Sequence, residues 1–250
     1  MILFLFLTQL IVLSDKINVM KKLVILTGAG ISAESGIQTF RDADGLWEGH
    51  HVMDVASPEG FAKNPELVLD FYNQRRKQLL AVKPNKAHYN LAELENYFDV
   101  EIITQNVDNL HVKAGSTNVT HLHGELLKVR SSVDENLVLD WHKDLVLGNL
   151  CTHNSQLRPH IVWFGEMVPM LDRAIEITLK ADILVIIGTS MQVYPAASLI
   201  NYVQRDIPIY FVDPKPSVSE NDFNNLTIIK DIASSGTNAL NELLKNTYIS

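Results

Sequence analysis

Two histidines stand close together in the segment His121-Leu122-His123-Gly124-Glu125. An imidazole titrates near neutral pH, so a histidine can act as a base that takes a proton from a hydroxyl group. Residues two apart on a strand point to the same face, so the spacing does not choose between His121 and His123. The alternative is that each is a structural histidine held by hydrogen bonds. The segment is therefore a candidate for general-base chemistry.

A glycine-rich segment, Gly28-Ala29-Gly30-Ile31-Ser32-Ala33, follows an apolar run and fits the pattern G-x-G-x-x-A. Glycines let the backbone approach a pyrophosphate, and the N-terminus of a following helix favours its negative charge. The alternative is an ordinary tight turn from strand to helix. In a dehydrogenase of this type, a second strand about 20 residues further on ends in an acidic residue that binds the ribose. Residues 39–47 read instead as a loop, which disfavours a hydride-transferring enzyme.

Amides and a carboxylate gather in the segment Thr104-Gln105-Asn106-Val107-Asp108-Asn109-Leu110. Such groups can hydrogen-bond a carboxamide and ribose hydroxyls. Asn106 and Asp108 can equally serve as caps of the next helix. The local pattern leaves both interpretations open.

Four short apolar runs have the composition of buried parallel strands that would position these segments. They are Leu23–Leu26, Val100–Thr104, Ile183–Gly188 and Ile207–Val212. The helical patterns are at Pro65–Leu80, Lys86–Tyr97, Leu171–Ala181, Ala196–Gln204 and Thr237–Lys245. The alternation predicts an α/β fold with a Rossmann-like, doubly wound parallel sheet. Ligands of such folds lie at the carboxyl ends of the strands, where this chain carries Gly28, Gln105, Gly188 and Asp213.

Two stretches interrupt the alternation, and we expect them to form a smaller lobe over the sheet. Residues 41–83 read as a loop followed by a helix, and residues 126–159 have mixed polarity with little periodicity. The main domain would then comprise residues 20–40, 84–125 and 160–250.

The composition excludes several classes of protein. With 46% hydrophobic and 20% charged residues the chain is not disordered, and a formal net charge of −8 argues against nucleic acid as a partner. One cysteine, Cys151, excludes an internal disulfide and fits the cytoplasm. The apolar start Met1–Leu13 is shorter than the about 20 residues that span a bilayer, and it lacks the flanks of a signal peptide. We expect residues 1–19 to be either an over-extended start, with the native protein beginning at Met20, or a loosely attached extension; a membrane anchor is the alternative. We expect the protein to be a monomer without a membrane partner.

Five blocks of this sequence closely resemble the sirtuins, a family of NAD-dependent protein-lysine deacylases. The blocks are GAGISAESGIQTFRDADGLW (28–47), TQNVDNLH (104–111), HG (123–124), VWFGE (162–166) and GTSMQVYPAA (188–197). They occur in the family's order and cover nearly the whole chain, from Lys21 to about Leu244. Five ordered blocks are far more specific than any one of them.

The resemblance implies a set of residues that bind NAD. They are Gly28, Ala29, Gly30, Ile31 and Ser190 for the phosphates, Phe40 and Arg41 on a loop that closes over the cofactor, Gln105, Asn106 and Asp108 for nicotinamide and its ribose, and Gly188, Thr189, Asp213 and Ala233 for the adenosine. Many relatives carry asparagine at the position of Asp213, whose carboxylate can still accept bonds from ribose hydroxyls.

The resemblance also implies the reaction, in which His123 matches the family's catalytic base. The carbonyl oxygen of an acylated lysine attacks the ribose carbon as nicotinamide leaves, and His123 helps a ribose hydroxyl attack the imidate. The products are free lysine, nicotinamide and O-acyl-ADP-ribose. The substrate backbone would add as a strand between two edges of the site, which carry Val162, Phe164, Gly165, Glu166 and Val193.

The pair Tyr72 and Arg75 bears on the acyl group that is removed. The two residues are three apart in the predicted helix Pro65–Leu80, so they share one face. A phenol and a guanidinium can hold a carboxylate, and Tyr-x-x-Arg resembles the sirtuin subgroup that removes succinyl, malonyl and glutaryl groups. The alternative is a solvated helix face and a plain deacetylase. We predict acidic acyl groups as substrates, with weaker deacetylation.

Most sirtuins bind a structural zinc ion through two C-x-x-C pairs, and the corresponding residues here are Ser131, Asp134, Cys151 and Asn154. Because neither pair survives, we expect no metal site and a lobe packed around Leu137, Leu139, Trp141 and Leu145. An irregular set of Cys151, His153, His142 and Asp134 is the alternative.

Two other functions would use the same site. A mono-ADP-ribosyltransferase would pass ADP-ribose from NAD to a protein, and the mass of the product would identify it. A binding module that senses NAD would perform no turnover, which retention of His123 disfavours.

Overall fold

The computed structural model describes residues 20–38, 46–219, 222–223 and 225–249. The predicted extension 1–19 and the predicted cofactor residues Phe40 and Arg41 lie outside these ranges. Within them, no helix is long and apolar enough to cross a membrane.

Six parallel strands form the central sheet, in the order β11-β10-β9-β1-β4-β5. Their bounds are β1 Lys22–Thr27, β4 Asp99–Thr104, β5 Val119–His121, β9 Ile183–Ile187, β10 Ile209–Val212 and β11 Leu226–Ile229. The four predicted strands are present, and the Rossmann-like α/β fold is confirmed. β5 was missed because a strand of three residues is too short to show a pattern, and β11 because its sequence LTII is interrupted by a threonine and forms no continuous apolar run.

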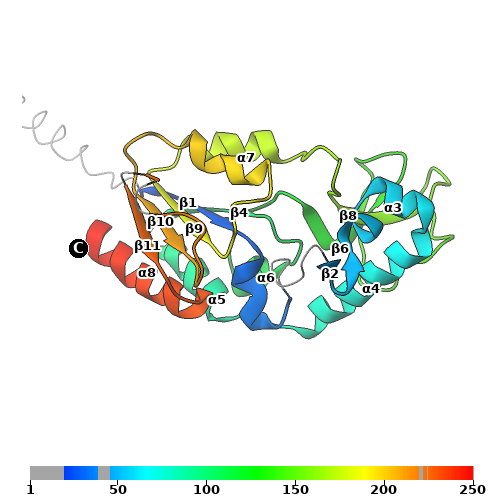
Figure 1. The fold of residues 1–250 in the computed structure, drawn as a ribbon, viewed down its shortest axis with the longest axis horizontal. Coiled ribbons are helices and arrows are strands. Elements are labelled where there is room, and N and C mark those ends of the chain that lie inside the picture. The colour runs from blue at the N-terminus through cyan, green and yellow to red at the C-terminus, as the bar shows by residue number, and fades with distance from the viewer. Residues whose placement is uncertain (1–19, 39–45, 220–221, 224, 250) are drawn as a thin grey trace, which may run out of the picture.

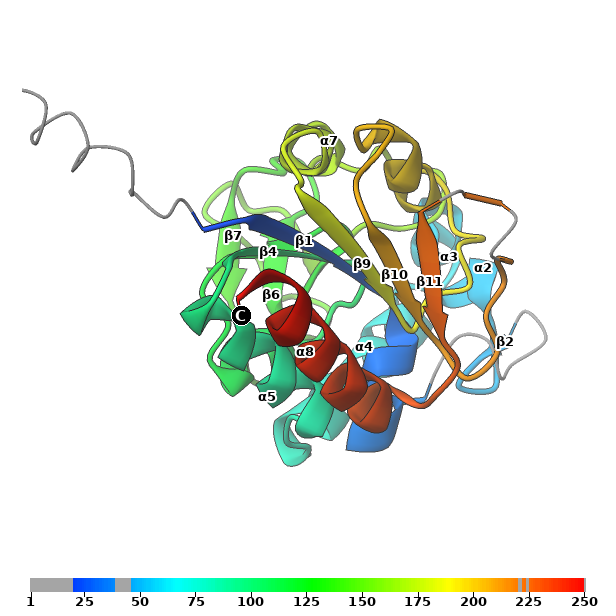
Figure 2. The ribbon, with the colours of Figure 1, turned by 90° about the vertical axis from the view of Figure 1, so that its left-hand side faces the viewer.

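Helices cover both faces of this sheet (Figure 2). One face packs against α5 (Lys86–Glu93) and α8 (Ala233–Tyr248), and the other against α7 (Leu171–Thr178) and the 3-10 helix η4 (Ala196–Tyr202). Successive side chains of a strand point to opposite faces, so Leu23 and Ile25 of β1 join the first core, and Val24 and Leu26 join the second. Burial on both faces explains the continuous apolar runs in the sequence.

Two corrections apply to the predicted helices. The segment Ala196–Gln204 forms a short 3-10 helix instead of an α-helix, and the closing helix begins at Ala233, ahead of the predicted Thr237. The remaining short elements are η1 Ala29–Ser35, η3 Leu94–Asn96 and α6 Leu110–Ala114.

A smaller lobe lies beside the main sheet (Figure 1). Its antiparallel sheet has the order β7-β6-β8, with β6 Gly124–Ser131, β7 Val138–Asp140 and β8 Leu157–Ile161. The first interrupting stretch adds the hairpin β2 Leu46–Trp47 and β3 His50–His51, and the helices α2 Val52–Val55, α3 Pro58–Lys63 and α4 Pro65–Ala81. Side chains of α4 pack against β6 and β8 in a shared apolar core, so the two stretches form one lobe.

The packing of this lobe differs in part from the prediction. Leu145 is buried, and Leu137 and Trp141 pack against the same cluster, which also includes Cys151. Leu139 is 43% exposed, so the prediction was wrong for this residue. It lies on β7, which pairs only with β6 and is therefore an edge strand with one side open to solvent.

Candidate active site

A cavity of about 750 Å³ lies at the carboxyl ends of β1, β4, β9 and β10 and extends to the small lobe. It brings together most of the residues predicted to bind NAD or substrate. These are Gly28, Ala29, Gly30, Gln105, Asn106, Asp108, Gly188, Thr189, Ser190, Asp213 and Ala233, together with His123, Tyr72, Arg75, Val162, Phe164, Gly165, Glu166 and Val193. Ile31 is an exception, because its side chain is fully buried in the core below the turn.

The glycine-rich turn packs directly on the end of β9. The Gly28 amide donates to the Ile187 carbonyl at 3.0 Å, and the Gly30 amide donates to the Gly188 carbonyl at 2.8 Å. A Cβ atom on Gly30 would lie 2.6 Å from the Gly188 Cα, which is a steric clash. Glycine avoids this clash because it has no Cβ atom. The turn therefore presents bare backbone to the cavity, and the helix that follows it is the 3-10 helix η1.

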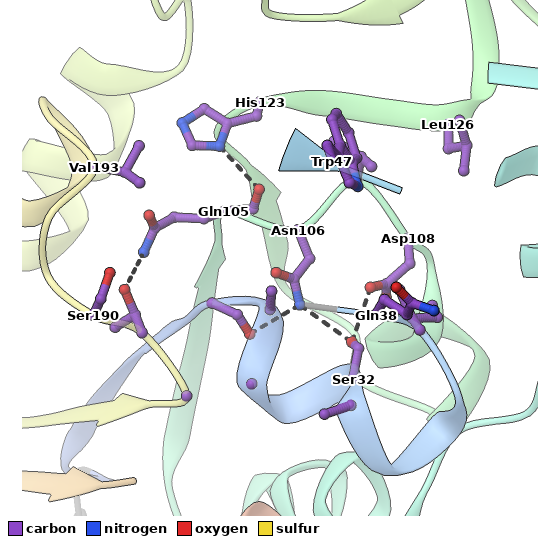
Figure 3. Close-up of a pocket in the computed structure, with 18 of the residues that line it drawn as sticks. Ser32, Gln38, Trp47, Gln105, Asn106, Asp108, His123, Leu126, Ser190 and Val193 are labelled. Carbon is purple, nitrogen blue, oxygen red and sulfur yellow. Dashed lines mark hydrogen bonds between the residues drawn. The ribbon is translucent and has the colours of Figure 1, made fainter. Parts of the chain in front are cut away.

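A buried polar cluster joins this turn to the end of β4 (Figure 3). Ser32 Oγ donates to Asp108 Oδ2 at 2.9 Å, and Asn106 Nδ2 donates to the Gly28 carbonyl at 3.1 Å. Asp108 Oδ1 also accepts from the Leu110 amide at the start of α6, whose N-cap residue is Asn109, and Asn106 holds the turn. Neither side chain is therefore the N-cap of that helix. Burial raises the pKa of Asp108, although these hydrogen bonds oppose the effect.

The structure distinguishes between the two histidines. β5 ends at His121 and β6 begins at Gly124, so His123 lies in a turn and the expectation that both point to one strand face is wrong. His123 lines the cavity, whereas the His121 ring contacts the Asn106 carbonyl at 3.3 Å and is not among the lining residues. Of the two candidate bases, His123 is the one that faces the cavity.

The hydrogen bond of His123 fixes which ring nitrogen is basic. His123 Nδ1 lies 2.9 Å from the Gln105 carbonyl oxygen (Figure 3). A carbonyl only accepts, so Nδ1 carries the proton and Nε2 of the neutral ring keeps its lone pair. Burial lowers the pKa of His123 and so favours the neutral ring, although the bond to Gln105 opposes the effect. Nε2 is thus available as a base near neutral pH.

Tyr72 and Arg75 of α4 line the same cavity. Tyr72 is fully buried, and its hydroxyl accepts a hydrogen bond from Trp163 Nε1 at 2.9 Å. Burial raises the pKa of Tyr72, so the phenol stays protonated. Arg75 Nε lies 4.0 Å from Glu48 Oε1 and has no hydrogen-bond partner among the residues that the structure describes.

The carboxylate of Glu166 is fully engaged within the protein. It accepts from Arg158 at 2.6 and 3.1 Å, from Arg130 at 3.1 Å and from the Trp163 amide at 2.8 Å. Burial disfavours the charge, but these donors outweigh it and hold the pKa of Glu166 below its usual value. Its side chain therefore fixes the segment 162–166.

The residues that correspond to the zinc ligands of most sirtuins are joined by weak hydrogen bonds. Cys151 Sγ donates to Ser131 Oγ at 3.3 Å, and Ser131 Oγ accepts from the Val133 and Asp134 amides at 3.2 Å. Among the described residues, no group of three or more histidine, cysteine, aspartate and glutamate side chains is placed to bind a metal ion. The irregular set around Cys151 and His142 is therefore not assembled.

Several lining residues were not singled out in the sequence. They include Ser32, Gln38, Trp47, Glu48, Leu126, Ile161 and Trp163. Ser32, Trp47 and Trp163 fall within blocks that carry the family resemblance, which was the available signal. Glu48 lies outside every block and reaches the cavity only because the β2–β3 hairpin folds towards α4.

A parallel sheet with bare backbone and polar groups at neighbouring strand ends defines the class of dinucleotide-binding α/β proteins. Comparison with known proteins narrows this class. A model of the Sir2 family matches residues 28–195. The NAD-dependent protein deacylase of Helicobacter pylori (strain ATCC 700392 / 26695) is 66% identical over 196 residues, which cover 78% of this chain and 86% of that protein. The chain belongs to the Sir2 family, the sirtuins.

Solved structures of the family agree with this assignment. A Sir2 homologue in complex with NAD has a TM-score of 0.80 at 40% sequence identity, covering 91% of this chain and 90% of that one. Sir2 bound to an acetylated peptide has a TM-score of 0.73 at 29% identity, covering 95% of this chain and 98% of that one.

Proposed function

We propose that this sirtuin uses NAD to remove acyl groups from lysine side chains of proteins or peptides, and that it prefers acyl groups ending in a carboxylate. One observation carries the deacylase proposal. The fixed imidazole of His123 presents a basic Nε2 in the same cavity as the glycine-rich turn. The relatives that bind NAD and an acetylated peptide support the substrate class.

The residues present fit NAD. Bare backbone at Gly28 and Gly30 suits the phosphates, the polar cluster of Asn106 and Asp108 suits nicotinamide and its ribose, and Asp213 suits the second ribose. Bound NAD would supply the ribose carbon that accepts the acyl oxygen and the nicotinamide that leaves.

The chain's own contribution to the reaction centres on His123. Its Nε2 would accept the proton of a ribose hydroxyl as that oxygen becomes a nucleophile, and the Gln105 carbonyl would stabilise the imidazolium that forms. The apolar walls contributed by Leu126, Ile161 and Val193 would exclude water from this step.

The preference for acidic acyl groups rests on Tyr72 and Arg75. The phenol is buried and protonated, and the guanidinium is only partly neutralised by Glu48 at 4.0 Å. A carboxylate at the end of a succinyl or malonyl chain would receive a hydrogen bond from each. An acetyl group has no oxygen at that position and would be removed more slowly.

Competition between two substrates tests both parts of this proposal. Purified protein is mixed with NAD and equal amounts of matched succinyl-lysine and acetyl-lysine peptides, and both peptides are followed by mass spectrometry. We expect faster loss of the succinyl group together with nicotinamide release. Loss of acetyl alone would leave a plain deacetylase. A peptide gaining the mass of ADP-ribose would indicate a transferase, and no nicotinamide release would indicate a binding module.

We also propose that the small lobe folds without zinc. The apolar cluster around Leu145, Cys151 and Leu157 and the hydrogen bond from Cys151 to Ser131 support this proposal. Protein purified in zinc-containing medium is expected to hold well under one zinc ion per chain by elemental mass spectrometry, and a chelator should leave its unfolding temperature unchanged. Stoichiometric zinc would overturn the proposal. Cytoplasmic location and a monomeric state remain predictions from the sequence.

A further inference from the structure

Trp163 contacts the side chain of Tyr72, which together with Arg75 forms the proposed acyl clamp. Its indole Nε1 donates to the Tyr72 hydroxyl at 2.9 Å, and Trp163 is only 2% exposed. An indole N–H can only donate, so it occupies a lone pair of the phenol oxygen and leaves the phenol proton for another partner. Among the described residues, the structure gives this proton no acceptor, and Tyr72 lines the cavity.

Other contacts fix the position of the Trp163 indole ring and backbone. The Arg158 guanidinium lies over the indole ring, with Cζ 3.4 Å from the ring centroid. Glu166 binds both Arg158 and the Trp163 backbone amide, so the ion pair and the tryptophan form one connected unit. The ring also contacts Phe61 at a centroid distance of 5.3 Å. These contacts leave the indole little freedom to turn its N–H away from Tyr72.

We infer that Trp163 is a specificity-determining positioning residue, which acts through Tyr72 by directing the phenol proton towards the carboxylate of an acidic acyl group. The inference rests on the proposed preference for such groups and extends it. Without the indole N–H, the phenol O–H can rotate about its C–O bond and turn its proton away from the cavity. A neutral acetyl group makes no use of this proton, so its removal is independent of the contact.

The inference is tested by replacing Trp163 with phenylalanine, which keeps an aromatic ring and removes the donor. We expect KM for the succinyl-lysine peptide to rise about fivefold, the loss that one neutral hydrogen bond can account for, while kcat stays nearly constant. The acetyl-lysine peptide should lose much less, so the succinyl-to-acetyl ratio of kcat/KM should fall by about the same factor. Trp141→Phe is the matched control. Trp141 lies in the same lobe, and its buried indole N–H has no hydrogen-bond partner among the described residues.

A double-mutant cycle with Tyr72→Phe separates positioning from structural damage. If Trp163 acts through the phenol, Trp163→Phe should leave the succinyl-to-acetyl ratio of kcat/KM unchanged once the hydroxyl is gone. Equal losses for both peptides, or a further fall of the ratio in the double variant, would overturn the inference. A different result would contradict the proposed clamp itself: an unchanged succinyl-to-acetyl ratio of kcat/KM in the single variant Tyr72→Phe.

Discussion

Replacing His123 with alanine is expected to lower kcat/KM for every acyl-lysine peptide by about a hundredfold to ten-thousandfold, the range typical of a lost general base. Nδ1 of His123 donates its hydrogen bond to the Gln105 carbonyl, so Nε2 is the ring nitrogen that is available as a base in the cavity. The variant should still bind NAD, since the glycine-rich turn and Asp108 lie elsewhere on the sheet edge. Steady-state kinetics and calorimetric NAD titration measure the two effects.

His121→Asn is the matched control, because this histidine does not line the cavity and the shorter amide can still donate towards the Asn106 carbonyl. It should retain most of the activity. A larger loss in His121→Asn than in His123→Ala would contradict the assignment of the base.

The same base determines the pH dependence of the reaction. Only the neutral imidazole can accept a proton, so kcat/KM should fall as the pH drops through the pKa of His123 in the free enzyme. Burial lowers this pKa, and an exposed histidine titrates at about 6.5, so we expect the acidic limb below about pH 6.5. A limb centred above that value would show that burial does not control this group.

The sequence was sufficient for those parts of the fold that depend on local pattern. The buried strands appeared as continuous apolar runs because helices cover both faces of the sheet, and α4 appeared because its 17 residues begin with Pro65 after the cap Asn64. The three-stranded sheet of the small lobe did not appear, because β7 has only three residues and β8, LRPHI, carries polar residues and a proline within the strand.

The site was predictable to the extent that its residues lie in ordered family blocks. Spacing alone could not choose between His121 and His123, because the choice depends on β5 ending at His121. Similarly, nothing in the sequence pairs Trp163 with Tyr72, which stand 91 residues apart, or places Glu48 beside Arg75. Such contacts follow from how the small lobe packs, which depends on tertiary structure.

Replacing Arg75 with methionine is expected to lower kcat/KM for a succinyl-lysine peptide by about tenfold to a hundredfold, the equivalent of a charge-assisted hydrogen bond of about 1.5–3 kcal/mol. Methionine keeps the apolar stem of the side chain and removes the guanidinium, whose Cζ lies 4.8 Å from the centroid of the Phe71 ring. The acetyl-lysine peptide should change little, because its acyl group has no carboxylate to lose a partner. Kinetics with both peptides measure the ratio directly.

Glu48→Gln is the complementary variant, and it should change the same ratio in the opposite direction. Glu48 has a backbone φ of 50°, a left-handed conformation that is unfavourable for a glutamate, and its carboxylate lies 4.0 Å from Arg75 Nε. In that position it partly neutralises the guanidinium and repels an incoming carboxylate. Glutamine has nearly the same shape without the charge, so kcat/KM for the succinyl peptide should rise about twofold to fivefold, as for a partly exposed ion pair.

A rise in one variant and a fall in the other are hard to obtain from damage to the fold, because a loosened lobe would slow both peptides in both variants. If Glu48→Gln instead lowers succinyl removal, Glu48 holds Arg75 in place for the substrate and does not compete with it. If neither variant changes the ratio, the guanidinium does not meet the acyl group, and the preference for acidic acyl groups must be abandoned. The deacylase proposal would still stand in that case, because it depends on His123 and the NAD-binding residues and not on Arg75.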